Sequence, residues 1–150
     1  MPDITHRLDL IESRIQILNL IYGYAHAFDY REESLLLSLF HSDGMIDLGP
    51  AFGKSEGHAA IAKTAAELWT KMPKMRHWMS NPLIEIAGDR ATAVSMIHGV
   101  MIDSDEKPAE VAGRYTDHIE RRDGRWAIAK RQFDAHYWVP LSDWIPSHSA

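Results

Sequence analysis

The chain of 150 residues contains no cysteine, and it lacks long apolar runs as well. Without cysteine it can form neither a disulfide nor a thiolate nucleophile, and we expect a cytoplasmic protein. No apolar run approaches the roughly 18 residues that a membrane-spanning helix needs. The first residues, MPDITHRLDLIESR, are charged and helical in pattern. They therefore do not resemble a signal peptide.

Charge and motifs exclude further classes of protein. The net charge is −5, and lysine and arginine form no patch that could bind phosphates. We therefore expect neither a nucleic acid nor a membrane as partner. The nine histidines show no HxxxH or HExxH spacing, and the chain has no P-loop and no GxSxG motif. The sequence thus predicts no metal site and no cofactor, and a small molecule remains as the expected partner.

The hydrophobic content of 45% suits one domain that spans residues 1–150. Helical patterns cover 5–28, 31–41 and 55–71, and residues 45–48 form a short strand. The second helical segment should end at Ser42-Asp43-Gly44, and Ser55 could cap the third. Strand patterns follow at 75–87, 90–102, 110–121 and 125–138. This order predicts an α+β fold in which a curved antiparallel sheet packs on about three N-terminal helices, with a pocket at its open end. The tail after Pro140, with Trp144, is expected to cover that end or a neighbouring subunit.

Asp29 ends the first helical segment in an unusual place. It continues an apolar stripe with helical spacing, beside a second stripe made by Ile17, Ile21, Tyr24 and Phe28. The first stripe comprises Leu8, Ile11, Ile15, Leu18, Tyr22 and Ala25. A carboxylate at a helix C-terminus is disfavoured by the helix dipole, and a buried one needs a partner.

His77 is the partner that strand alternation suggests. His77 and Met79 should face the apolar interior while Trp78 faces outward, although Pro82 could insert a bulge. A His bonded to a buried Asp has a fixed tautomer and can act as a general base. The alternative is a structural histidine bonded to the backbone, with Asp29 solvated at a frayed helix end.

Further site candidates follow from the same face argument. Arg131 lies on the face of the last strand that carries Phe133, so we expect it to point inward and to neutralise Asp29 or bind a substrate oxygen. Tyr24 could donate a hydrogen bond to a leaving oxygen. The side chains expected to contact the apolar body of a substrate are Tyr22, Met79, Trp69, His98 and Phe133.

The segments IYGYAHAFDYREESLLLSLFHSDG, RHWMSN, GRYTDHIERRDGRWAIAKR and YWVPL together resemble SnoaL-like proteins of the NTF2-like superfamily. The resemblance covers roughly residues 8–141 and is nearest to the branch of scytalone dehydratase, bile-acid 7α-dehydratase and hexachlorocyclohexane dehydrochlorinase. It implies a cone-shaped α+β fold and a proton-abstracting dyad formed by His77 and Asp29. It also assigns site roles to Tyr24, where the dehydrochlorinase has lysine, and to Arg131.

These patterns predict a cofactor-independent lyase of the dehydratase type, acting on a hydrophobic hydroxylated ring compound. The catalytic residues would be His77, Asp29, Tyr24 and Arg131. An isomerase or cyclase using the same base is the first alternative, and a non-catalytic binding or assembly module is the second. We expect a homo-oligomer, either a dimer or a trimer, because the outer face of such a sheet is often covered.

Overall fold

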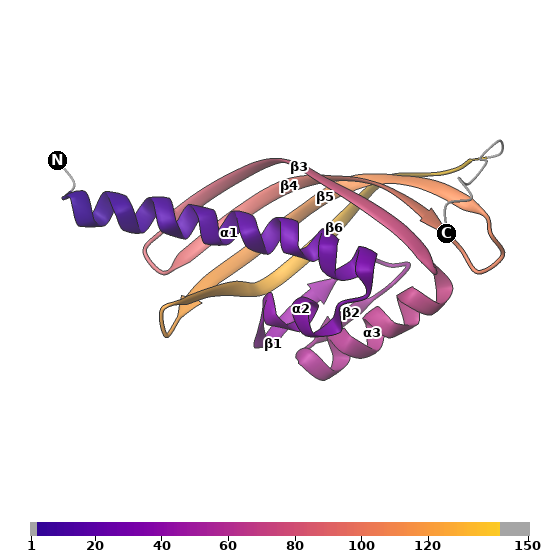
Figure 1. Ribbon diagram of the computed structural model, residues 1–150, viewed down its shortest axis with the longest axis horizontal. Helices are drawn as coiled ribbons and strands as arrows, with labels where there is room; N and C mark the ends of the chain where they lie inside the picture. The colour runs from indigo at the N-terminus through magenta and orange to yellow at the C-terminus, as the bar shows by residue number, and fades with distance from the viewer. Residues whose placement is uncertain (1–2, 142–150) are drawn as a thin grey trace.

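The computed structural model describes residues 3–141 of the chain (Figure 1). Its helices are α1 (Ile4–Tyr30), α2 (Glu33–Ser38) and α3 (His58–Lys71). Its strands are β1 (Phe40–Asp47), β2 (Lys54–Glu56), β3 (Lys74–Ala87), β4 (Arg90–Ile102), β5 (Pro108–Arg122) and β6 (Arg125–Pro140). Trp144 and the rest of the predicted covering tail lie outside the described residues.

The strands form one curved sheet in the order β2-β1-β6-β5-β4-β3, and the helices lie against one face of it (Figure 1). Consecutive strands from β3 to β6 pair antiparallel, whereas β1 pairs parallel to β6. The predicted α+β class and the four long antiparallel strands are therefore confirmed. Within the described part of the chain, each helix is too short or too polar to cross a membrane.

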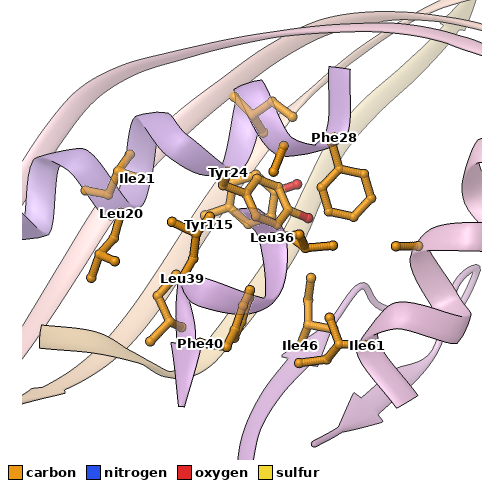
Figure 2. Packing of buried hydrophobic residues seen from close by; sticks show 14 of the residues in the cluster. Leu20, Ile21, Tyr24, Phe28, Leu36, Leu39, Phe40, Ile46, Ile61 and Tyr115 are labelled. Atoms are coloured by element: carbon orange, nitrogen blue, oxygen red, sulfur yellow. The ribbon is translucent and has the colours of Figure 1, made fainter. Parts of the chain in front are cut away.

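The prediction for the buried face of α1 was wrong. The second stripe enters the core, where Ile17 is fully buried. Ile21 and Tyr24 of the same stripe are also almost fully buried (Figure 2). Most of the first stripe is instead exposed: Leu8, Ile11, Ile15 and Tyr22 are each about half exposed, and only its end at Asp29 turns inward. A helix with two apolar stripes can pack either one on a sheet, and periodicity does not decide between them.

The second predicted helix, 31–41, is much shorter in the structure. It ends at Ser38, and Phe40 already pairs with Ile128 of β6. Leu36 of α2 and Phe40 of β1 are both fully buried (Figure 2). The apolar residues of this segment therefore belong partly to a helix and partly to a strand. Long-range pairing with β6 overrides the local helical pattern here.

Two features near the site follow from backbone geometry. The bulge expected at Pro82 is present, since the β3–β4 register shifts between Ser80 and Leu83 and Asn81 has a positive φ of 51°. Ser55, expected to cap α3, belongs to β2, and Gly57 precedes the helix with a φ of 79°. Glycine adopts that angle more readily than serine.

Candidate active site

Asp29 and His77 are joined by two hydrogen bonds. The Nδ1 atom of His77 lies 2.6 Å from Oδ1 of Asp29, and the backbone N–H of His77 donates to Oδ2 at 2.9 Å. The side chains are only 8% and 6% exposed. Because Nδ1 and the backbone amide both bind the carboxylate, the imidazole ring is fixed, and Nε2 is the nitrogen left for chemistry.

The unfavourable dipole at the end of α1 is offset by donors from α3 and β3. Trp69 donates its indole N–H to the carbonyl of Phe28 at 2.9 Å, and Arg76 donates to the carbonyl of Asp29 at 3.4 Å. Arg31 ends the helix in the left-handed conformation and donates to the carbonyl of Pro73 at 2.6 Å. Cations and N–H donors at a helix C-terminus are favourable, so this end can hold a carboxylate.

His77 lies on the wall of a pocket between the sheet and the helices. Its other polar wall groups are the phenols Tyr24 and Tyr115, and the wall is otherwise mostly apolar, including Phe28, Phe133, Trp138 and three methionines. Among residues 3–141, no Asp, Glu, Lys or Arg belongs to the lining. A wall of this character suits an uncharged, mostly apolar molecule that carries one or two oxygens.

Behind the two phenols lies a buried ion pair. Arg131 donates from Nε and Nη2 to the two carboxylate oxygens of Asp117, each at 2.7 Å, and both residues are fully buried. The guanidinium carbon lies 4.2 Å from the ring centre of Tyr24 and 4.7 Å from that of Tyr115. The cation thus packs on both aromatic rings without reaching the cavity itself.

The phenols are protonated throughout the physiological pH range. Burial raises the pKa of Tyr24 well above 10, and it also raises the pKa of Tyr115, which the nearby Arg131 cation partly counteracts. A group with such a pKa donates a hydrogen bond rather than accepting a proton. His77 is therefore the side chain of the described lining that carries a basic nitrogen able to accept a proton.

The structure corrects part of the prediction for Arg131. Arg131 does point inward, as the strand pattern predicts, but it pairs with Asp117 and not with Asp29. Asp117 lies on β5 beside β6, directly opposite Arg131 in the sheet register. A partner on the adjacent strand is nearer than one at a helix end, so the expected Asp29–Arg131 pair does not form.

Of the five predicted substrate-contacting residues, Phe133 lines the cavity. Tyr22 lies on the exposed face of α1 because the other stripe is the buried one. His98 lies on the outer face of the sheet, where it pairs with Glu110 and stacks on Trp78. Met79 and Trp69 pack in or against the core beside the site without forming its wall.

Sequence reasoning missed Tyr115, Asp117 and Trp138. Alternate residues of β5 from Ala109 to Ile119 are buried, so a face argument like the one used for Asp29 could have found Asp117 and Tyr115. Trp138 could not be found in that way. The β5–β6 register shifts between Ala112 and Gly113, which reverses the alternation of β6 and brings Trp138 to the cavity in place of Tyr137.

The described residues hold no cluster of three His, Cys, Asp or Glu side chains arranged to bind a metal ion. Asp29 and His77 supply two such groups, and the next acidic residue in the interior, Asp117, is bound to Arg131.

Curated relatives of the chain are dehydrochlorinases. The γ-hexachlorocyclohexane dehydrochlorinase of Sphingobium indicum is 27% identical over 140 residues, which cover 90% of this chain and 88% of the relative. The hexachlorocyclohexane dehydrochlorinase 1 of the same species is 26% identical over equal length, covering 89% of its own chain.

Solved structures agree with the predicted cone. The crystal structure of LinA has a TM-score of 0.89 at 26% identity, covering 93% of this chain and 98% of its own. A scytalone dehydratase-like protein from Novosphingobium aromaticivorans has a TM-score of 0.78 at 23% identity, covering 95% of this chain and 97% of its own, and supports the fold alone. The sequence profile of the family described as SnoaL-like domain matches residues 9–132 of this chain. The chain therefore belongs to the SnoaL-like family, within the NTF2-like fold.

Proposed function

We propose that this protein is a lyase that eliminates water, or a related oxygen leaving group, from an uncharged hydroxylated ring compound. One observation carries the proposal: His77 lies on the wall of an apolar cavity with Nδ1 bound to Asp29. The resulting geometry holds Nε2 ready as a general base. The relatives named as dehydrochlorinases also support a lyase, because loss of HCl is an elimination.

A single base can serve both halves of the reaction. Nε2 of His77 removes a proton from carbon, and Asp29 stabilises the imidazolium that results. The electron pair of the broken C–H bond then forms the double bond as the C–O bond breaks, and the imidazolium protonates the departing hydroxyl, so water leaves and the histidine returns to its neutral form. The phenols of the wall keep their protons, so the proton that reaches the leaving oxygen comes from the imidazolium of His77.

The character of the wall selects the substrate class. A carboxylate or phosphate on the substrate would be buried without a cation, since no Lys or Arg belongs to the described lining. The free-energy cost of burying an unpaired charge is far larger than the gain from apolar contacts with the wall. The substrate is therefore neutral, with an apolar ring against Phe28, Phe133 and Trp138.

Product mass tests the proposal. The purified protein is incubated with neutral β-hydroxy ring ketones and, in a second arm, with γ-hexachlorocyclohexane, the compound named for the relatives. We expect loss of 18 mass units (about the mass of one water) from at least one hydroxylated compound, and little or no release of chloride. Chloride release with no dehydration would contradict the preference for an oxygen leaving group.

An isomerase is the second candidate, because two phenols beside a base could stabilise an enolate without any leaving group. Conversion of a ring ketone to a product of unchanged mass would identify this activity and exclude the lyase for that compound.

We also propose that the protein works in the cytoplasm as a homo-oligomer, either a dimer or a trimer. The outward stripe of α1, with Leu8, Ile11 and Ile15, exposes apolar area that a second copy could cover. Light scattering coupled to size exclusion measures the mass directly. A monomer at high concentration would contradict this assignment.

A further inference from the structure

The cavity beside His77 is too small for a ring compound as it stands. Its volume is about 50 Å³, whereas an engineered apolar cavity that holds benzene measures roughly 150 Å³. Side chains in a protein interior are close-packed, so a ring can enter only if part of the wall moves. The part that moves then determines which molecules reach His77.

A second hollow, of about 460 Å³, lies on the far side of one part of this wall. The side chains that line both spaces form the partition between them, and they are Leu48, Phe52, Phe133 and Trp138. The hollow is also bordered by Asp134, whose side chain is 53% exposed and pairs with Arg114. The hollow therefore adjoins solvent, and the partition separates it from the base.

Two members of the partition are held firmly by the fold. Leu48 is only 8% exposed, and Phe133 lies in β6 opposite Tyr115, on whose ring it packs with centres 5.2 Å apart. The other two are held less firmly, because Trp138 is 46% exposed and Phe52 lies in the loop between β1 and β2. The ring centres of Phe52 and Trp138 are 6.4 Å apart, so the two side chains meet across the partition.

The loop formed by residues 48–53 is hydrogen-bonded mainly to itself. The N–H of Leu48 donates to the carbonyl of Gly53 at 2.9 Å, and the N–H of Gly53 donates to the carbonyl of Gly49 at 2.7 Å. The two glycines have φ angles of 78° and 76°, which glycine adopts readily. Within the described part of the chain, residues 50–52 make no hydrogen bond to another segment. The tip of the loop can therefore swing outward while its internal bonds stay intact.

We infer that Phe52 and Trp138 form a gate, and that Phe52 moves with its loop to admit the ring of the substrate. The inference rests on the proposed function and deepens it, because it identifies the residues that limit the size of the molecule that reaches His77. When the gate opens, the cavity and the hollow join into one space that is large enough for a ring. Phe52 thus determines which substrates are admitted and takes no part in the proton transfer.

The test measures access to the cavity with a thiol, because the chain contains no cysteine of its own. Met75 lines the cavity and is only 4% exposed, so Met75→Cys places a single thiol on the inner wall. Mass spectrometry follows its alkylation by iodoacetamide and by iodoacetanilide, which differ by one phenyl ring. Each rate is measured in Met75→Cys alone and with Phe52→Ala added. The matched control adds Leu83→Ala, which removes an exposed apolar side chain that lines neither space.

We expect Phe52→Ala to raise the rate with iodoacetanilide from a few-fold to about tenfold, because the contact between aromatic rings that keeps the gate closed is lost. The rate with iodoacetamide should rise less, since the smaller reagent needs a smaller opening. Leu83→Ala should change neither rate. An unchanged iodoacetanilide rate in Phe52→Ala, or an equal rise for both reagents, would overturn the gate.

A thiol in the core distinguishes a gate from a general loosening of the fold. Ile17 is fully buried and lines neither space, so Phe52→Ala should leave the alkylation rate of Ile17→Cys unchanged. A rise at this position equal to that at Met75→Cys would contradict the gate. If Phe52→Ala does not fold, as judged by circular dichroism, Trp138→Ala removes the other half of the gate and should give the same selective rise.

The alkylation rates do not depend on turnover, so the gate and the proposed function can fail separately. A protein that shows the selective rise but dehydrates no compound would contradict the proposed function and leave the gate standing. A protein that dehydrates a ring compound while its alkylation rates ignore Phe52 would keep the lyase and lose the gate.

Discussion

Two acid–base pairs are buried within residues 3–141, Asp29–His77 and Asp117–Arg131, and they differ in what surrounds them. The first pair joins a helix end to β3 and shows one side of the imidazole to the cavity. The second joins β5 to β6, has no exposed surface, and lies between aromatic rings. The two pairs therefore serve different purposes. Asp29–His77 borders the cavity and can react with a substrate, whereas Asp117–Arg131, which we call the sealed pair, can only support the residues packed around it.

The choice of cation follows the same division. Histidine changes its charge within the physiological range, as a general base requires. Arginine stays charged, and its planar guanidinium binds a carboxylate with two parallel bonds while packing on aromatic rings. Burial lowers the pKa of Arg131, but Asp117 outweighs this and raises the pKa overall. Arg131 therefore keeps its charge beside Asp117.

The comparison is tested most strongly at His77. His77→Gln should lower kcat by about 10²–10⁴, the usual contribution of a general base. It should lower the free energy of unfolding by only about 1–3 kcal/mol, because Asp29 loses one of its two hydrogen bonds. The backbone bond of residue 77 to Asp29 does not depend on the side chain. Turnover is measured by the loss of water from the substrate found in the panel, and unfolding by urea titration.

His98→Gln is the matched control, because His98 also pairs with a carboxylate but lies half exposed on the outer face of the sheet. It should retain the activity of the wild type. Equal loss of activity in the two variants, or full activity in His77→Gln, would contradict the assignment of the base.

The sealed pair should show the reverse behaviour when it is broken. Asp117→Asn leaves the buried Arg131 without its counter-charge, which should lower the free energy of unfolding by about 3–5 kcal/mol. Replacing both partners, as in Asp117→Leu with Arg131→Met, should cost much less, because no charge then remains buried. Urea unfolding of the single and double variants gives the coupling between the two positions.

If the double variant were as unstable as Asp117→Asn, the apolar packing of Arg131 on the tyrosines would matter more than its charge. If Asp117→Asn were as stable as the wild type, Arg131 would have another way to satisfy its charge, and the sealed character of the pair would be wrong.

Sequence patterns predicted the structure best where local preferences and the tertiary fold favour the same arrangement. Strand alternation brought His77 inward and Trp78 outward, as found in the structure, where Trp78 is about half exposed. The predicted strand boundaries at 87/90 and 121/125 agree with the structure, where Gly88 and Asp123 have the positive φ of tight turns. The Asp29–His77 contact required the additional step of placing a helix end beside β3, which the family resemblance supplied.

The patterns failed where two solutions fit the same local rule. Both stripes of α1 are apolar, and the prediction took the mostly exposed stripe as the buried one. It therefore wrongly assigned Tyr22 to the pocket wall. The register shift in β6 cannot be predicted from the sequence pattern. Strict alternation would turn Tyr137 toward the cavity, but the shift brings Trp138 there instead. Asp117 was overlooked although it lies on a buried face, because its role depends on Arg131 of the neighbouring strand.

The smallest expected effect appears at high pH, and it separates the phenols from the dyad. Unfolded phenols lose their protons near pH 10, whereas burial raises the pKa of Tyr24 and Tyr115 in the folded state. Between these values the unfolded chain binds fewer protons, so the stability that the buried phenols contribute is fully present below pH 10 and is lost as the pH rises above it. Urea midpoints at pH 8, 9.5 and 11 should therefore fall less steeply in Tyr24→Phe than in the wild type. Tyr22→Phe and His77→Gln should follow the wild type, because neither removes a buried phenol, and a decline of equal slope in all four proteins would show that the phenols do not titrate as buried groups.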